Sequence, residues 1–461
     1  HVFKRNGYEW DVGIHYIGGV NHHKTLMYAL FHYISGGQMQ WEDMGEVYDK
    51  VRFGDELFEF RKGPKNFLKQ LQEYFPDPAD QRAIEQYLEL VQEANAASTN
   101  YFAEKALPPL VAKVAGGQMR KGFLRFAEQT TLEVLEELTT NRKLIAVLTA
   151  QFGDYGLPPG QSSFAMHAMV VNHYLHGAAF PAGGSSTIAE TISEVIAAAG
   201  GLILTNAEVS ELIVENKRAA GVKMADGQTL RAPLIISGVG VRNSYLHLMP
   251  EPWRTEYDLA HQAQQVQPSA AHMCLYLGFK ETAAELGLQK ANYWIYPDGQ
   301  YDHDLNVERF VEDATAEFPV VYISFPSAKD PHWEERYPGR ATVDIITLAP
   351  YDWFEKWEGT SWKRRGADYE AFKEGLKERL LEVLYRYEPQ LRGKVDHAEL
   401  STPLSTKDFV NYQHGEIYGI NHDPGRFGQT FLRPQTPLKN FYLTGQDIVT
   451  AGIGGALMSG V

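Results

Sequence analysis

The sequence contains a single cysteine, Cys274, among its 461 residues. One thiol excludes an intramolecular disulfide framework and any C-x-x-C metal or redox motif. Because Cys274 lies in the apolar run HMCLYLGF (272–279), we interpret it as a small buried side chain. Basic residues are also scarce: 43 Lys and Arg against 58 Asp and Glu give a net charge of −15. That balance argues against nucleic-acid binding, which needs a basic face.

Several motifs with a well-defined chemistry are missing as well. The sequence has no HExxH, P-loop or G-x-S-x-G pattern. His22 and His23, and the group His167, His173 and His176, have no carboxylate or cysteine at ligand spacing. We therefore predict no metal site and interpret these histidines as structural.

No segment approaches the ~18 consecutive apolar residues of a membrane-spanning helix. We therefore expect a cytoplasmic protein or one that binds a membrane surface. ALPPLVAKVAGG (106–117) is the predicted contact for such a surface. It combines apolar residues with Lys113, and Arg120 and Lys121 follow in a chain that is otherwise acidic.

The hydrophobic pattern predicts an α/β protein with two kinds of region. Residues 62–150 are rich in helix formers, and leucines in 126–152 recur at helical spacing. A capped helix is predicted after Thr187, followed by strands at 202–205, 208–215 and 221–225, with an Asp-Gly turn between the last of these and LIIS (234–237). The apolar run LIIS predicts a strand buried on both faces. The runs AAHMCLYLGF, FPVVYISFP and ATVDIITLAP predict one antiparallel sheet, followed by a helix over 367–389.

The C-terminal segment YLTGQDIVTAGIGGALMSGV (442–461) is typical of the closing half of a flavin site, yet the G-x-G-x-x-G turn of the opening half is absent. GVGVRN (238–243) begins correctly but has Asn243 at the third glycine position. We interpret Gly238 and Gly240 either as a bend near the cofactor or as a plain turn.

Five segments occur in the order found in carotenoid-type flavin oxidoreductases, a family that includes phytoene desaturases, carotenoid isomerases and retinol saturases. They are DVGIHYIGG (11–19), FPAGGSSTIAETI (180–192), GVKMADGQTLRAPLIIS (221–237), TPLSTKDFVNYQHGEIYG (402–419) and FYLTGQDIVTAGIGGALMSG (441–460). The pairing of the first with the last resembles the retinol saturase branch. The resemblance places the G-x-G-x-x-G turn before His1, and the sequence also ends inside a predicted helix, so we expect both ends to be truncated.

The resemblance implies a Rossmann-type FAD-binding domain of the glutathione-reductase-like kind, which is discontinuous and lacks its first βαβ unit here. We predict that it comprises residues 1–19, 180–245 and 396–461. An inserted α+β substrate domain, with an antiparallel sheet and a helical insert, would comprise 20–179 and 246–395.

The resemblance also implies which residues bind FAD. Asp447 would accept a hydrogen bond from the ribityl chain, and the backbone at Val209 would hold the adenine. Glycines near the flavin have a physical reason, because backbone N–H groups approach the ring only where no side chain intervenes. The implied set is Gly13, Ile14, Val209, Gly238, Gly445, Asp447, Gly452, Ile453, Gly454 and Gly455.

His15 and Tyr418 are the candidate catalytic residues. The resemblance places the segment around His15 beside the isoalloxazine ring, and an imidazole with an ordinary pKa near ~6.5 suits a proton donor or acceptor at neutral pH. His15 is therefore a proton donor or flavin-tuning group, or else a hydrogen-bonded structural histidine. Tyr418 is the weaker candidate for the same cavity.

We therefore predict an FAD-dependent oxidoreductase that acts on a carbon–carbon double bond of an isoprenoid polyene, as retinol saturases and carotenoid desaturases do. NAD(P)H or another partner would exchange the electrons. Two alternatives remain open: a redox-neutral carotenoid isomerase, and a non-catalytic prenyl-lipid-binding protein of the same fold. The direction of the reaction, the particular substrate and the oligomeric state are not encoded in any motif we recognise.

Overall fold

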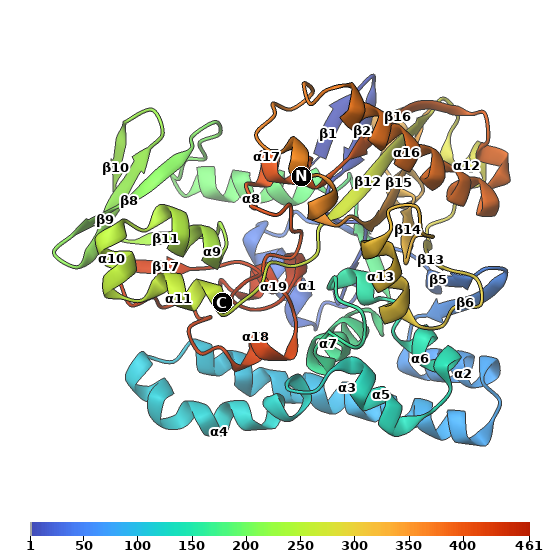
Figure 1. Ribbon diagram of the computed structural model, residues 1–461, viewed down its shortest axis with the longest axis horizontal. Helices are drawn as coiled ribbons and strands as arrows, with labels where there is room; N and C mark the ends of the chain where they lie inside the picture. The colour runs from blue at the N-terminus through green and yellow to red at the C-terminus, as the bar shows by residue number, and fades with distance from the viewer. Residues whose placement is uncertain (1) are drawn as a thin grey trace.

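A seven-stranded mixed sheet is the largest element of the computed structural model, which describes residues 2–461 (Figure 1). Its order is β16-β12-β15-β14-β13-β5-β6. In that order the strands are Val395–Ser401, His272–Phe279, Ala341–Leu348, Val321–Ser324, Asn292–Tyr296, Val47–Phe53 and Glu56–Arg61. The antiparallel pairing predicted for the three apolar runs is confirmed, since these are β12, β14 and β15. The sheet as a whole is mixed rather than antiparallel, because β13 and β5 run parallel.

The two faces of this sheet differ in character. On one face Val343 and Ile345 of β15 pack in an apolar cluster with Leu376 and Leu380 of helix α16 (Ala367–Tyr387), which confirms the predicted helix. The opposite face carries polar side chains, including Asp344, that are fully buried. Alternation along the strand places neighbouring residues on opposite faces.

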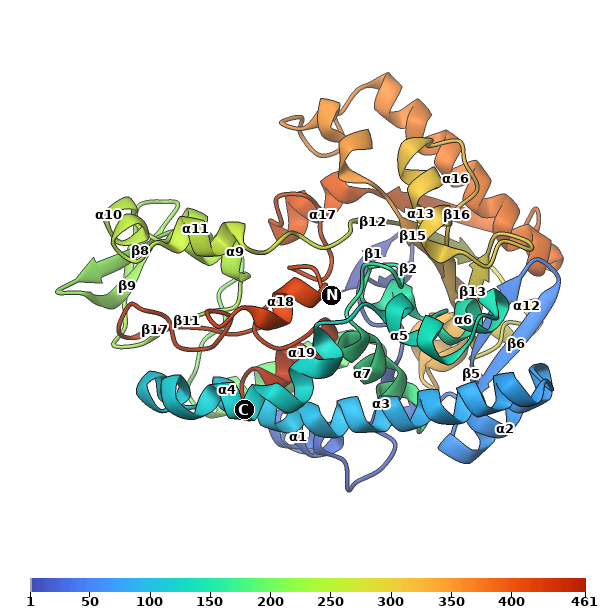
Figure 2. The same ribbon diagram turned by 60° about the horizontal axis from the view of Figure 1, so that its bottom comes forward.

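A layer of helices lies along the other side of the molecule, at the base of Figure 1, and the longest of these helices runs across the lower part of Figure 2. The layer comprises α2 (Pro64–Tyr74), α3 (Pro78–Lys105), α4 (Pro109–Ala127), α5 (Thr131–Leu138), α6 (Arg142–Leu148) and α7 (Phe164–Tyr174). The stretch 126–152 forms two helices, because Thr130 and Glu133 form a capping box and Asn141 caps the next helix. Within residues 2–461, no helix is both long and apolar enough to cross a bilayer.

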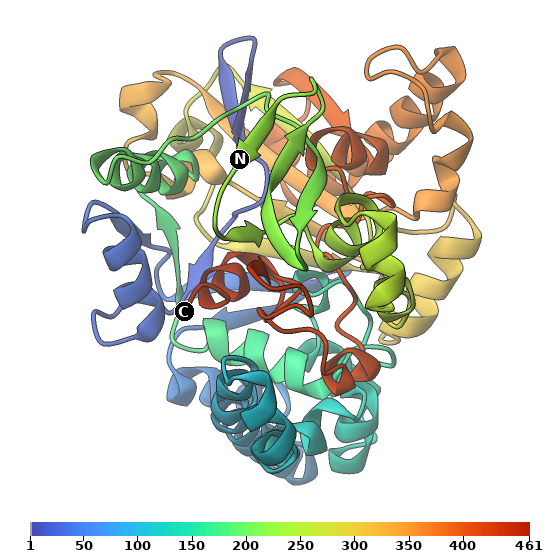
Figure 3. The same cartoon turned by 90° about the vertical axis from the view of Figure 1, so that its left-hand side faces the viewer.

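The region between residues 180 and 245 forms helix α8 (Ser186–Ala198), a meander and a parallel strand pair. The meander is β8 (Val209–Glu215), β9 (Arg218–Met224) and β10 (Thr229–Arg231), seen at the front of Figure 3. The pair is β11 (Ile235–Ser237) with β17 (Phe441–Leu443).

Two strand predictions here are wrong. Residues 202–205 form no strand, and Leu202 is 79% exposed because no neighbouring strand pairs with it. β11 is not buried on both faces: among the described residues it pairs with β17 alone, and Ile236 is 61% exposed. Helix α8 begins one residue before the predicted cap at Thr187, whose hydroxyl donates to the Gly184 carbonyl instead.

The N-terminal hairpin belongs with the large sheet rather than with β11 and β17. Strands β1 (Val2–Arg5) and β2 (Tyr8–Asp11) turn at Asn6-Gly7, and the Trp10 indole donates to the Leu277 carbonyl of β12 at 2.9 Å. Strand β16 also lies in the large sheet. The hairpin packs against β12 through Tyr8 and Trp10, and β16 pairs with β12, while the predicted domain boundaries stay a prediction.

The remaining elements are short connections around these layers. A small sheet pairs β3 (Ile17–Gly18), β7 (Ala178–Pro181) and β4 (Trp41–Asp43). The helices are α1 (Leu26–Ile34), α9 (Val241–Asn243), α10 (Glu251–Glu256), α11 (Leu259–Gln264), α12 (Ala283–Leu286), α13 (His303–Glu312), α14 (Pro326–Lys329), α15 (Trp333–Arg336), α17 (Pro403–Val410), α18 (Pro424–Gly428) and α19 (Gly452–Met458).

Candidate functional site

Two predicted cofactor residues lie side by side at the carboxyl ends of β11 and β17. Gly238 follows β11 and Gly445 follows β17, and the Thr444 N–H donates to the Ser237 carbonyl at 2.9 Å. A side chain on Gly445 would begin 3.7 Å from the Gly238 carbonyl oxygen. In α/β folds, ligands bind outside the carboxyl ends of parallel strands, which is where this glycine pair lies.

Asp447 joins three segments at this edge. One carboxylate oxygen accepts the Val241 N–H at 2.7 Å, and the other accepts the Ile420 N–H at 3.1 Å. The side chain is buried, and a Cβ on Gly419 would lie 1.9 Å from Asp447 Oδ1, so only glycine fits there. Burial raises the pKa of Asp447, while Arg426 and the two amide bonds oppose that rise. Both hydrogen bonds to the Asp447 carboxylate thus come from backbone N–H groups.

Arg426 was not predicted from the sequence, yet it holds the turn that contains Asp447. Its guanidinium donates to the carbonyl groups of residues 420, 421, 446, 447 and 449, at 2.8 to 3.4 Å. Burial lowers the pKa of Arg426 to about 10. His422 supports the same turn, since its Nε2 accepts the Ala451 N–H at 2.8 Å. An isolated arginine in DPGRFG gives no motif from which this role could have been recognised.

The glycine run opens α19 and meets the segment around residue 14. Ile14 and Ile453 belong to one apolar cluster, and a Cβ on Gly454 would lie 3.0 Å from Met27 of α1. Gly455 is required because a Cβ there would lie 1.9 Å from the Thr450 carbonyl oxygen. At Gly13 and Gly452, by contrast, a Cβ would meet nothing within 4 Å. Open space therefore borders both segments.

Val209 lies apart from this group. It is the first residue of β8, in the meander, where it pairs with Met224. Its predicted contact with adenine stays a prediction.

His15 lies in the connection between β2 and β3, and its side chain is next to Asp344 on the polar face of the large sheet. Its side chain is 12% exposed, and Nδ1 lies 3.6 Å from Asp344 Oδ2. The His15 carbonyl accepts a hydrogen bond from Lys329 Nζ at 2.8 Å. Burial, with the charges of Lys329 and His272, lowers the pKa of His15 to about 3. With its pKa lowered in this way from the ordinary value near ~6.5, the imidazole is neutral at neutral pH.

Tyr418 has its hydroxyl engaged elsewhere. The group donates to the Gly153 carbonyl at 2.9 Å, and burial raises its pKa. This contact places Tyr418 next to Asp154 and makes its hydroxyl a structural donor.

A buried polar network lies next to His15, and no sequence motif predicted it. The Tyr16 hydroxyl is 3.1 Å from carboxylate oxygens of both Asp49 and Asp154. Asp49 also accepts hydrogen bonds from the amides of Gln151 at 2.9 Å and Asn292 at 3.0 Å. Burial raises the pKa of Asp49 to about 6.

Lys329 connects this network to His15. Its ammonium group donates to the Asn292 side-chain oxygen, to Ser324 Oγ at 2.7 Å and to the His15 carbonyl. Burial lowers the pKa of Lys329 to about 7, against the opposing effect of the nearby acids.

Two of the histidines that could suggest a metal, His167 and His173, have structural partners. The two nitrogens of His167 bond the hydroxyls of Tyr87 and Tyr155, and His173 Nε2 accepts the Gly18 N–H. Over residues 2–461, no group of three His, Cys, Asp or Glu side chains is arranged to hold a metal ion.

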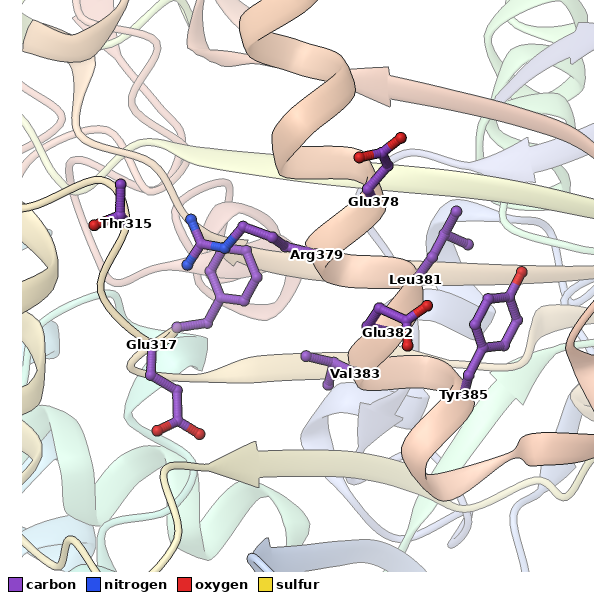
Figure 4. A pocket seen from close by; sticks show the side chains of 9 residues that line it. Thr315, Glu317, Glu378, Arg379, Leu381, Glu382, Val383 and Tyr385 are labelled. Atoms are coloured by element: carbon purple, nitrogen blue, oxygen red, sulfur yellow. The ribbon is translucent and has the colours of Figure 1, made fainter.

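A surface hollow of about 720 Å³ lies beside α16, lined by Thr315, Glu317, Phe318, Glu378, Arg379, Leu381, Glu382, Val383 and Tyr385 (Figure 4). It contains none of the candidate residues. The Arg379 guanidinium stacks over Phe318 and donates to two backbone carbonyl groups, so the arginine is already satisfied.

Solved structures define the fold. A putrescine oxidase matches all of this chain and 88% of its own with a TM-score of 0.61 at 12% identity. An oxidoreductase from Methanosarcina mazei matches 99% of this chain and 89% of its own, with a TM-score of 0.58 at 14% identity. The α/β fold, with its mixed sheets, is that of the FAD-dependent amine oxidases.

Sequence relatives define the family more narrowly. All-trans-retinol 13,14-reductase from Danio rerio is 35% identical over 99% of this chain and 78% of the relative. An inactive all-trans-retinol 13,14-reductase from the same species is 29% identical over the whole chain and 78% of that relative. A neurosporene-forming phytoene desaturase from Cereibacter sphaeroides is 26% identical over 61% of this chain and 52% of its own. No family model matches the chain. The protein belongs to the all-trans-retinol 13,14-reductase family, within the flavoprotein oxidoreductases of the retinol saturase and carotenoid desaturase group.

Proposed function

We propose that the protein is an FAD-dependent saturase that reduces a carbon–carbon double bond of a retinoid-like polyene. The observation that carries this proposal is the meeting of the glycine run at the start of α19 with the segment around residue 14. Family membership supports the choice of a polyene, because the named relatives act on retinol and phytoene.

The residues present fit the flavin end of FAD. Gly238 and Gly445 leave the strand ends without side chains, and open space borders Gly13 and Gly452. Arg426 fixes the turn between the strand and the glycine run. When bound, the flavin would supply hydride chemistry, and the protein would align the polyene and exclude water.

His15 is the proposed proton donor to the carbon that does not receive the hydride. A neutral imidazole still carries one N–H, which it can give to a developing carbanion if another group replaces the proton. His15→Gln should retain flavin but lose at least about a hundredfold in turnover, the low end for general acid–base catalysis.

The test is anaerobic incubation of the full-length, reduced protein with all-trans-retinol, followed by mass spectrometry of the product. A saturase adds two hydrogen atoms, a desaturase acting on phytoene with oxidised flavin removes two, and an isomerase leaves the mass unchanged. A colourless preparation that binds the polyene without changing it would support the prenyl-lipid-binding alternative. This outcome is worth testing because one relative is named as an inactive all-trans-retinol 13,14-reductase. An unchanged substrate or an isomer would contradict the proposal.

We also propose that the start of α4 contacts the membrane from which a lipophilic substrate enters. Leu110, Val111 and Val114 are 82%, 47% and 88% exposed. Residues 106–127 contain four Lys or Arg and no acidic residue, in a chain of net charge −15. An exposed apolar helix start on a helix with basic residues suits anionic lipid headgroups.

Vesicle sedimentation tests this surface. We expect binding to phosphatidylserine-containing vesicles but weaker binding to neutral ones. The Leu110→Asn/Val114→Asn variant should lose at least about tenfold in partitioning, since each side chain contributes ~1.5–3 kcal/mol when buried. Phe409→Asn is the matched control, because Phe409 is also an exposed apolar residue, at 68%. Equal binding of both variants would contradict a specific α4 contact.

A further inference from the structure

Polar side chains form a row across the large sheet at one register. Asp344 of β15 lies opposite Tyr276 of β12 and Ser324 of β14, and Asn292 of β13 lies opposite Asp49 of β5. The antiparallel register of β13 and β14 aligns Asn292 with Ser324. Apart from Tyr276, which is 4% exposed, every member is completely buried. Burying polar groups costs free energy unless each finds a partner.

Asp344 is the member of the row without a partner. Asp49, Asn292 and Ser324 are bonded to one another or to Lys329. Both carboxyl oxygens of Asp344 are buried without a hydrogen bond among the described residues. His15 Nδ1 is likewise buried without a hydrogen bond among the described residues, and it lies 3.6 Å from Asp344 Oδ2.

The geometry of the two side chains is complementary. A separation of 3.6 Å is longer than a hydrogen bond, but catalytic contacts are often loose until the substrate is bound. A proton held between Asp344 and His15 Nδ1 would satisfy both groups at once. His15 Nε2 is not among the fully buried unpartnered atoms, so this nitrogen remains available to a ligand.

We propose that Asp344 is the positioning residue of His15: its carboxyl group donates to Nδ1, keeps the N–H on Nε2 and replaces the proton that His15 gives to the substrate. This proposal deepens the proposed function and rests on it for the substrate.

The proton balance closes with one proton from solvent. When bound, reduced flavin would supply the hydride equivalent for one carbon of the double bond, and the Nε2–H proton of His15 would go to the other carbon. The Asp344 O–H proton moves to Nδ1, which leaves a neutral imidazole and a carboxylate. After turnover, solvent would protonate Nε2 while the Nδ1 proton returns to Asp344, which restores the pair, and the two electrons of the reduction would come from the flavin.

Burial is the largest effect on the protonation of Asp344 in the resting state, and the surrounding charges add smaller effects of opposite sign. Asp11 of β2 and Lys329 of α14 act on the Asp344 carboxyl, and Cys274 and Tyr276 of β12 lie next to it. Lys329, His272 and the Tyr322 ring face His15. Burial raises the pKa of Asp344, and the Lys329 ammonium group stabilises the carboxylate that forms when the proton leaves.

Nitrogen NMR of histidine-labelled protein tests the pair without any substrate, with His15→Gln to assign the signal. At pH 7 we expect His15 to be neutral with its proton on Nε2 in the wild type and in Asp344→Asn, whose amide still donates to Nδ1. Asp344→Leu should lose that single tautomer. A wild-type His15 that is cationic, or that carries its proton on Nδ1, would overturn the proposal even if the protein has no activity on polyenes.

Turnover then separates proton supply from structure. Asp344→Asn should keep bound flavin and its tautomer, yet lose at least about a hundredfold in kcat with little change in KM, because an amide cannot supply a proton. Asp344→Glu should recover part of the rate. Thr342→Val is the control, as Thr342 is equally buried on the same face and its hydroxyl has no partner among the described residues. Full activity of Asp344→Asn would overturn the proposal, and if this variant does not fold, the wild-type tautomer and Asp344→Glu still decide it.

Discussion

The hydroxyl of Tyr16 fixes where a proton must lie in the buried network, and this leads to a prediction about two neighbouring aspartates. A phenol has one proton, yet Tyr16 is 3.1 Å from both Asp49 and Asp154. It can donate to only one carboxylate, so the other must be protonated and donate to Tyr16. Asp49 already accepts bonds from Gln151 and Asn292, so we assign the charge to Asp49 and the proton to Asp154.

The pKa directions agree with this assignment. Burial raises the pKa of Asp154 well above its ordinary value, and the neighbouring charge of Asp49 adds to the rise. The donors around Asp49 oppose the effect of burial, and its pKa reaches only about 6.

Asp154→Asn should therefore change the free energy of unfolding by less than about 1 kcal/mol, since an amide reproduces the donor. Asp49→Asn should cost about 3 kcal/mol, because it removes the charge that accepts three bonds and that balances Lys329. Urea unfolding followed by circular dichroism at pH 7 measures both values. Equal destabilisation by the two substitutions, or a larger loss for Asp154→Asn, would refute the assignment.

Three further outcomes are expected. Asp447→Ala should lower the free energy of unfolding by about 2–5 kcal/mol in a urea titration, because it leaves two buried N–H groups unsatisfied; an unchanged midpoint would show that those amides find other partners. Arg426→Lys should weaken FAD binding at least about tenfold by fluorescence titration, since a single ammonium group cannot serve carbonyl groups on both sides of the turn; affinity equal to that of the wild type would contradict this. Burial raises the pKa of Asp11 to about 6, so the folded state binds the extra proton and stability should fall as the pH rises from ~4 to ~6, by up to about 3 kcal/mol. Asp11→Asn keeps an acceptor for Ser185 and should abolish that part of the pH dependence, whereas a variant with the wild-type pH profile would rule Asp11 out as its source.

The sequence predicted the fold best where local signals and packing agree. The apolar runs of β12, β14 and β15 and the helix after residue 367 follow from periodicity alone. The strand predicted at 202–205 failed because an apolar run forms a strand only if a partner pairs with it, and pairing is not a local property. The packing of the hairpin at 2–11 against β12 likewise depends on residues far away in the sequence.

Some residues of the candidate site could likewise be predicted from the sequence, and others could not. Glycines at strand ends and helix starts carry a backbone requirement that is visible in sequence, as at Gly445 and Gly455. Asp344, Lys329 and Arg426 carry none. Asp344 and Lys329 act on His15, which lies more than three hundred positions away, and Arg426 holds carbonyl groups on both sides of its turn, up to 23 positions away. Burial also changed the chemistry of His15, and no sequence pattern reports how far an imidazole lies from water.

The parallel pairing of β5 with β13 has a consequence for the synthesis of the protein. Asn292 and Asp49 are hydrogen-bonded although they are 243 positions apart. At ~5–20 residues per second, a ribosome needs about 12–50 s to make the partner after β5 emerges. During that interval the β5–β6 hairpin presents an unpaired edge, with Val51 and Phe53 exposed to other chains. Nascent chains that stop before residue 292 should therefore depend on chaperones to remain unaggregated.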